Sequence, residues 1–89
     1  MKTIHKFPLE VTDEQRIEMP EGSEILCVQV QHGQPCVWAK VIPDAAKVKR
    51  LFAVYGTGHP MTVRSADQYV GTFQLQGGAL VFHVYTESL

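Results

Sequence analysis

The chain has 89 residues, a formal net charge of −1 and no low-complexity tract, so we expect one domain spanning residues 1–89. A net charge near zero gives no field that attracts a polyanion, which argues against binding to duplex nucleic acid. The first residues lack the apolar run of a signal peptide, and no later segment is apolar enough to span a bilayer. We therefore expect a cytoplasmic protein without membrane contact.

Two strands are predicted at the N-terminal end, in residues 3–11 (TIHKFPLEV) and 14–20 (EQRIEMP), joined around Thr12 and Asp13. In the second of them Ile17 and Met19 alternate with charged neighbours, which is the period of a half-buried strand. Pro8 lacks an N–H group and therefore favours an edge strand. The segment MPEGSE that follows predicts a turn.

Residues 25–42 predict a β-hairpin with a two-residue turn at His32 and Gly33. This turn pairs Gln31 with Gln34 and fixes the register of both strands. One face is uniformly apolar and is expected in the core: Leu26, Val28, Val30, Val37, Ala39 and Val41. The opposite face is mixed: Ile25, Cys27, Gln29, Gln31, Gln34, Cys36, Trp38, Lys40 and Ile42.

The middle of the chain predicts a short helical turn in IPDAAK and then a strand over residues 48–55. In that strand Val48, Arg50, Phe52 and Val54 alternate with Lys49, Leu51, Ala53 and Tyr55. A connection of about thirteen residues follows, 56–68 (GTGHPMTVRSADQ), which is long for a compact domain.

Residues 69–86 predict a second hairpin, with Gly77 and Gly78 in the turn. Phe73 then pairs with Phe82, and the expected core face is Tyr69, Gly71, Phe73, Leu75, Leu80, Phe82 and Val84. No window shows a helical apolar period over three turns. Seven short strands predict an all-β fold, a compact antiparallel sandwich or small barrel.

Motifs for catalysis and for cofactors are missing from the sequence. Two cysteines make no disulfide framework, the four histidines are scattered without metal-ligand spacing, and no GxSxG or phosphate-binding loop occurs. These observations favour a non-enzymatic protein without cofactor or metal. Two alternatives stay open: His59 or His83 as a general base, and single-stranded nucleic acid on Lys49, Arg50, Phe52 and Tyr55.

The stretch YGTGHP is the first candidate site, with two interpretations. As a ligand loop, Gly56 and Gly58 bring backbone N–H groups close to an anion, while Thr57 and His59 donate hydrogen bonds. Tyr55 would stack on the ligand, and Arg64 would add charge together with Lys47, Lys49 and Arg50. In the second interpretation the stretch is a tight corner, in which both glycines adopt positive φ angles and His59 forms a hydrogen bond within its own loop.

Two further surfaces are candidates. The mixed face of the first hairpin, with Ile25, Cys27, Cys36, Trp38 and Ile42, is either covered by the N-terminal strands or forms the interface of a homo-oligomer. On the second hairpin, His83 and Tyr85 form a smaller polar-aromatic patch with Thr72.

Five segments of this sequence together resemble a known family: Met19-Pro20, Ile25-Leu26, Trp38, Gly56-Thr57-Gly58-His59 and the closing hairpin GTF…LVFH. They are similar to a small family of uncharacterised proteins from phage and bacterial genomes, a domain of unknown function. The resemblance implies a phage or prophage setting in a bacterial host and supplies no catalytic residues. In that setting we expect a non-enzymatic accessory protein that binds a small anionic or nucleotide-like ligand, such as a host immune signal. The alternative is a protein-interaction module, or an inhibitor of a host protein, acting through the Trp38 face.

Overall fold

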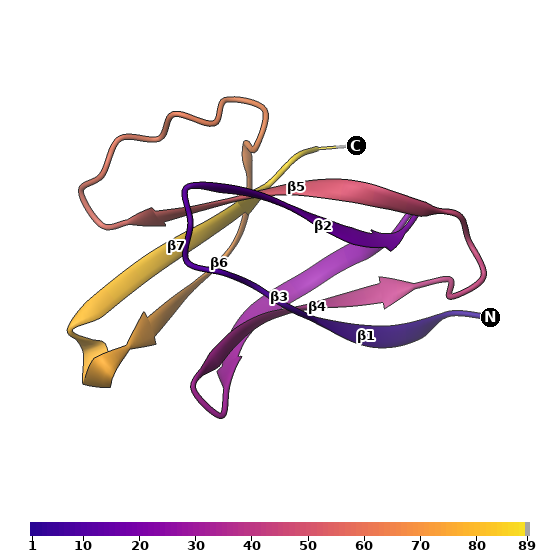
Figure 1. Ribbon diagram of the computed structural model, residues 1–89, viewed down its shortest axis with the longest axis horizontal. Helices are drawn as coiled ribbons and strands as arrows, with labels where there is room; N and C mark the ends of the chain where they lie inside the picture. The colour runs from indigo at the N-terminus through magenta and orange to yellow at the C-terminus, as the bar shows by residue number, and fades with distance from the viewer. Residues whose placement is uncertain (89) are drawn as a thin grey trace.

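A computed structural model of the protein describes residues 1–88. Within this range the predicted all-β fold with seven strands is confirmed (Figure 1). The strands are β1 (Thr3–Pro8), β2 (Glu14–Pro20), β3 (Glu24–Gln31), β4 (Gln34–Val41), β5 (Lys47–Gly56), β6 (Gln68–Leu75) and β7 (Leu80–Thr86). A single 3₁₀ turn, η1 (Gln76–Gly78), joins the last two strands.

The strands form two antiparallel sheets that pack as a sandwich, not as a closed barrel. One sheet has the order β1-β4-β3 and the other β2-β5-β7-β6. Pro8 lies on the edge strand β1, as predicted. The two N-terminal strands do not pair with each other, because β1 pairs with β4 and β2 with β5. The segment around Thr12 and Asp13 therefore crosses from one sheet to the other.

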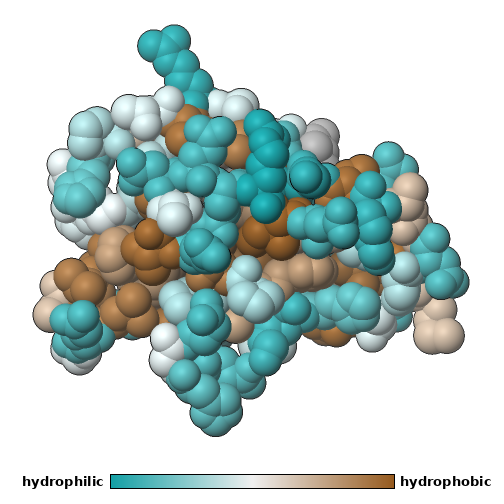
Figure 2. All heavy atoms as spheres, viewed as in Figure 1, coloured by the Kyte–Doolittle hydropathy of each residue, from teal (hydrophilic) through white to brown (hydrophobic). Residues whose placement is uncertain are grey.

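The main core lies between the sheets and takes residues from both. Its buried members are Leu9, Met19, Val28, Val37, Phe52, Val54, Phe73 and Val84. The molecule measures only 15 Å along its shortest axis. Viewed along that axis, hydrophobic residues form a broken band across the middle of the surface (Figure 2). So thin a sandwich buries few residues fully and leaves large apolar side chains such as Ile4 and Met61 exposed.

Both predicted hairpin registers are confirmed. His32 and Gly33 have φ angles of 51° and 78°, which make the two-residue turn and pair Gln31 with Gln34. In the second hairpin Gly77 and Gly78 have φ angles of 64° and 94°. Phe73 there pairs with Phe82, and Leu75 with Leu80.

The face assignment is wrong at the start of each hairpin, because both strands contain a β-bulge. The register of β3 shifts between Ile25 and Cys27, and that of β6 shifts between Tyr69 and Gly71. An extra residue in one strand turns the side chains before it to the other face. Ile25 and Val70 consequently pack against the core, whereas Leu26 is 41% and Tyr69 56% exposed.

Two other residues expected in the core, Val30 and Leu80, are 37% and 39% exposed. Both lie next to a hairpin turn, where the other sheet no longer covers them. In Figure 1 the two hairpin tips project at the same end of the molecule.

Strands β3 and β6 are the edge strands that meet along one side of the sandwich. A Cβ atom built on Gly71 would lie only 2.8 Å from Cγ1 of Val28. The missing side chain at position 71 is therefore what allows the two strands to approach so closely.

Strand β5 is buried on both faces. Phe52 and Val54 face the main core, while Leu51, Ala53 and Tyr55 form a second cluster on the outer face of the sheet. The connection between β5 and β6 covers this cluster with Ala66 and Val63. Figure 1 shows it as a wide arch. The length of this connection thus has a structural reason, since its residues Val63 and Ala66 complete a small core.

The predicted helical turn in IPDAAK is a β-turn, closed by a hydrogen bond of 3.0 Å from the Ala45 N–H to the Ile42 carbonyl. None of the described residues belongs to a helix with the length and apolar character needed to cross a membrane.

Candidate functional site

The stretch YGTGHP forms a turn in which the two glycines have different roles. The His59 N–H donates to the Gly56 carbonyl at 3.0 Å, and Gly58 has a φ of 88°, a conformation that favours glycine. Gly56 does not have a positive φ. A Cβ there would lie 3.1 Å from two atoms of the His59 ring. Gly58 thus makes the turn, and Gly56 makes room for the imidazole.

The backbone of this turn offers few donors to an anion. The Thr57 N–H donates to the Val81 carbonyl at 3.3 Å, and the His59 N–H is used within the turn. The expected row of N–H groups facing a ligand is therefore not formed. What the turn presents is side chains, namely the Thr57 hydroxyl and the His59 ring, and both residues are exposed.

Two depressions flank the turn, and Gly56, Thr57 and His59 line both of them. The His83 pocket has a volume of about 200 Å³, and its lining is Tyr55, Gly56, Thr57, Gly58, His59, Met61, His83 and Tyr85. The Leu80 pocket has about 350 Å³, and its lining is Gly56, Thr57, His59, Ala79, Leu80, Val81 and Phe82. The structure thus brings together five of the six predicted ligand residues. Arg64 is exposed and lines neither pocket.

A chain of hydrogen bonds links the turn to the patch predicted on the second hairpin. His83 Nε2 lies 2.7 Å from the Thr57 hydroxyl, and His83 Nδ1 lies 3.0 Å from the Thr72 hydroxyl. The Thr72 hydroxyl in turn lies 2.6 Å from the Tyr69 hydroxyl. The turn at residues 56–59 and the strands β6 and β7 therefore hold the His83 ring in one orientation. The stretch YGTGHP and the patch on the second hairpin thus form a single site.

Tyr55 is not placed for stacking on a ligand. It is 3% exposed, and its hydroxyl accepts a hydrogen bond of 3.0 Å from the Val63 N–H, which fastens the loop to β5. The accessible aromatic surface belongs to Tyr69 and Tyr85, whose ring centroids lie 5.5 Å apart in an edge-to-face arrangement.

The basic residues that flank the turn in sequence are dispersed in space. At about 3.3 Å per residue, the length of β5 separates Lys49 from Gly56 by roughly 20 Å. Arg50 is buried at the same far end of the strand. Among the described residues, the only ionisable side chains that line the two pockets are His59, His83, Tyr55 and Tyr85.

The bulge in β3 turns one of the residues predicted as an interface, Ile25, to the core face, and the others differ in their exposure. Ile25 packs on the core and Cys36 is 2% exposed, whereas Cys27 and Trp38 are half-buried and Ile42 is exposed. The N-terminal strands do not cover Trp38, because β1 lies beside β4 and not over it. Instead the Lys6 ammonium lies 5.8 Å from the centre of the indole ring and 2.5 Å from Oε1 of Gln31. A homo-oligomer through this face stays a prediction.

Sequence reasoning missed Leu80 and Phe82 as lining of the site. Alternation along the strand assigns both residues to the core, and no sequence signal places the second hairpin tip beside the turn at residues 56–59. Within residues 1–88 there is also no group of three side chains that could hold a metal ion.

Comparison with known proteins identifies the family of the chain. A family model described as a domain of unknown function, DUF7352, matches residues 1–89. The chain belongs to the DUF7352 family. No curated protein and no solved structure matches it. The predicted membership of an uncharacterised domain family is thereby confirmed, and the phage setting stays a prediction.

Proposed function

We propose that the protein is a non-enzymatic binding protein for a small ligand that combines a flat ring with an anionic group, as a nucleotide does. The observation that supports this most directly is the position of His59, on a ridge with a pocket on each side. A ligand that straddles the ridge would contact the Thr57 and His59 side chains at its middle. Together the pockets reach the size of typical small-molecule sites.

The two pockets differ in chemistry, which suggests an orientation for such a ligand. Apart from Thr57 and His59, which line both pockets, the Leu80 pocket is lined by apolar residues, including Leu80, which is 39% exposed and available to a flat ring. The His83 pocket contains the first two members of the hydrogen-bond chain, Thr57 and His83. The His59 ring makes no hydrogen bond with another described residue, so its nitrogens can donate to an anion.

His83 can tolerate a nearby anion without rearrangement. Both of its ring nitrogens face threonine hydroxyls, and a hydroxyl can donate or accept. Either tautomer of the ring therefore keeps the same two partners. The resemblance to phage proteins supports a nucleotide signal of host immunity as the ligand, met in the bacterial cytoplasm.

The test is a binding titration with mononucleotides and cyclic dinucleotides. Binding is measured by calorimetry and by the rise in Tm that a ligand of the folded state produces. We expect a member of this panel to bind with a Kd on the order of 10 μM. His59→Ala should weaken binding at least about tenfold, since a hydrogen bond to a charged group contributes roughly 1.5–3 kcal/mol.

Arg64→Ala is the matched control, because Arg64 lies on the same loop but lines neither pocket. It should change Kd by no more than about twofold, as expected of a screened surface charge. If no nucleotide binds, or if His59→Ala and Arg64→Ala weaken binding equally, the proposed site is wrong.

A second function is favoured by one observation on the other sheet. No described strand lies over the face with Trp38, and Ile4 on that face is 58% exposed. We propose that a second copy of the chain docks there. Sedimentation velocity across a concentration series should show a dimer that Trp38→Ala weakens at least about tenfold, as for a central aromatic anchor. Met61→Ala, another exposed apolar residue, should leave it unchanged. A monomer at all concentrations would contradict this proposal.

A further inference from the structure

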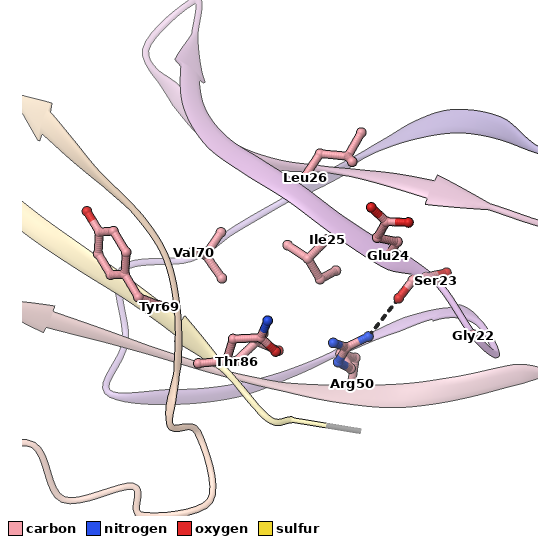
Figure 3. A pocket seen from close by; sticks show the side chains of 10 residues that line it. Gly22, Ser23, Glu24, Ile25, Leu26, Arg50, Tyr69, Val70 and Thr86 are labelled. Atoms are coloured by element: carbon pink, nitrogen blue, oxygen red, sulfur yellow. Dashed lines mark hydrogen bonds between the residues drawn. The ribbon is translucent and has the colours of Figure 1, made fainter.

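A third pocket lies away from the turn at residues 56–59, at the other end of β5. It has a volume of about 360 Å³ and opens where the bulges of β3 and β6 lie next to each other. Its lining is Gly22, Ser23, Glu24, Ile25, Leu26, Arg50, Gln68, Tyr69, Val70 and Thr86. The bulge in β3 turns Ile25 inward and leaves Leu26 at the rim of the pocket. The bulge in β6 turns Val70 inward and leaves Tyr69 at the rim. We call this the Arg50 pocket (Figure 3).

Arg50 extends from β5 into this pocket and is only 6% exposed. Its Nη1 donates to the Ser23 carbonyl at 3.0 Å, and its Nη2 donates to the Glu87 carbonyl over a long 3.4 Å. Nε is buried without a hydrogen-bond partner among the described residues. Nε and Nη2 form the side of the guanidinium that binds a carboxylate through two parallel bonds. This side is therefore the poorly satisfied one.

No carboxylate in the described chain hydrogen-bonds this buried cation. The carboxylate of Glu87, which acts on the Arg50 charge, accepts instead from the Leu51 N–H at 2.8 Å, and the carboxylate of Glu24 lies 3.6 Å from the Lys40 ammonium. Burial lowers the pKa of the Arg50 guanidinium from its ordinary value, and the charge of Glu87 opposes this effect. A buried cation that lacks a hydrogen-bonded anion is costly, so an anion that enters from outside would be stabilised there.

Two hydroxyl groups of the wall are already used within the protein, while Gln68 and Glu24 add further polar groups to the lining. The Ser23 hydroxyl donates to the Pro20 carbonyl at 2.6 Å, and the Thr86 hydroxyl donates to the Leu51 carbonyl at 2.7 Å. A ligand would thus meet one cation on the floor, the apolar side chains of Ile25 and Val70 beside the polar Gln68, and an aromatic ring at the rim. The carboxylate of Glu87 acts on the cation and Glu24 lines the pocket, so a monoanion fits this field better than a doubly charged phosphate.

We propose that the Arg50 pocket binds a small monocarboxylic acid with an apolar body, whose carboxylate pairs with Nε and Nη2 of Arg50. The apolar body lies between Ile25 and Val70 and reaches the rim at Leu26 and Tyr69. This site is separate from the nucleotide site proposed above and does not depend on it.

The test is an NMR titration of the full chain with benzoate, observing backbone amides and the Arg50 Nε–H signal. We expect saturable shifts of the Nε–H and of the amides of Glu24, Leu26 and Val70. The Kd should be on the order of 1 mM, as for a small ligand with one charge-assisted pair. Benzamide, which has the same shape without the charge, and inorganic phosphate should each bind at least about tenfold more weakly.

Variants at the rim keep the test informative, because replacing Arg50 itself removes a buried structural group. Leu26 and Ile42 are both 41% exposed, but only Leu26 lines the pocket. Leu26→Glu should weaken benzoate binding roughly tenfold through repulsion between the two carboxylates, whereas Ile42→Glu should leave it unchanged. Absence of shifts at Arg50, equal binding of benzamide, tighter binding of phosphate, or equal effects of the two variants would each overturn the proposal.

Discussion

Phe52→Ala should lower the free energy of unfolding by about 3–5 kcal/mol, the usual cost of truncating a fully buried aromatic residue. Phe52 is 0% exposed and lies at the centre of the main core, on the strand that is buried on both faces. A domain of this length has a total stability of roughly 4–13 kcal/mol. The variant should therefore be marginally stable, which urea denaturation followed by circular dichroism would show.

Leu26→Ala is the informative control for this experiment. Simple alternation along the hairpin places Leu26 in the core, but the bulge leaves it 41% exposed. We expect a loss of less than about 1 kcal/mol, as for most substitutions outside the core. A loss close to that of Phe52→Ala would mean that Leu26 is buried and that the bulge in β3 is misplaced.

These two residues show how far the sequence predicts the fold. Turn residues fix register locally, and for that reason His32-Gly33 and Gly77-Gly78 predict both hairpins correctly. A bulge leaves no such local signal, since one extra residue in a strand looks like ordinary sequence. Alternation therefore fails at Leu26 and Tyr69, where the register shifts.

The arrangement of strands into sheets depends on contacts between distant residues. The sequence predicts strands on both sides of Thr12 and Asp13, but it does not show that they join different sheets. Likewise, the sequence predicts the strand β5, but it does not show that the loop that follows covers its outer face with Val63 and Ala66. Apolar residues in a long loop were the available signal for this second core.

The candidate sites follow the same division between local and distant contacts. The turn at Gly56–His59 is a local feature, and the sequence singles it out. The pairing of His83 with Thr57 and Thr72 depends on loop, β7 and β6 coming together. The Arg50 pocket is hidden from sequence analysis, because it forms only where two bulged edge strands meet above a residue from a third strand.

Gly71→Ala should destabilise the protein by about 1–3 kcal/mol, the typical cost of overpacking a core. The new Cβ would lie 2.8 Å from Cγ1 of Val28, a β-branched side chain with little rotamer freedom. Gly71 does not have a positive φ, so backbone strain adds nothing. Thermal unfolding should show the effect as a fall in Tm of roughly 4–8 °C for each kcal/mol.

The same substitution made in a Val28→Ala background separates the close contact from other causes. Without Cγ1, the nearest remaining atom within 4 Å is the Val28 backbone nitrogen at 3.8 Å, an ordinary contact. The added methyl group then only reduces the freedom of the unfolded chain, which favours folding by about 0.4–1 kcal/mol. Gly71→Ala should therefore be neutral or slightly stabilising in that background. If Gly71→Ala destabilises the protein equally in both backgrounds, the close contact with Val28 is not the cause. The absence of a side chain at position 71 would then not be what allows β3 and β6 to approach each other.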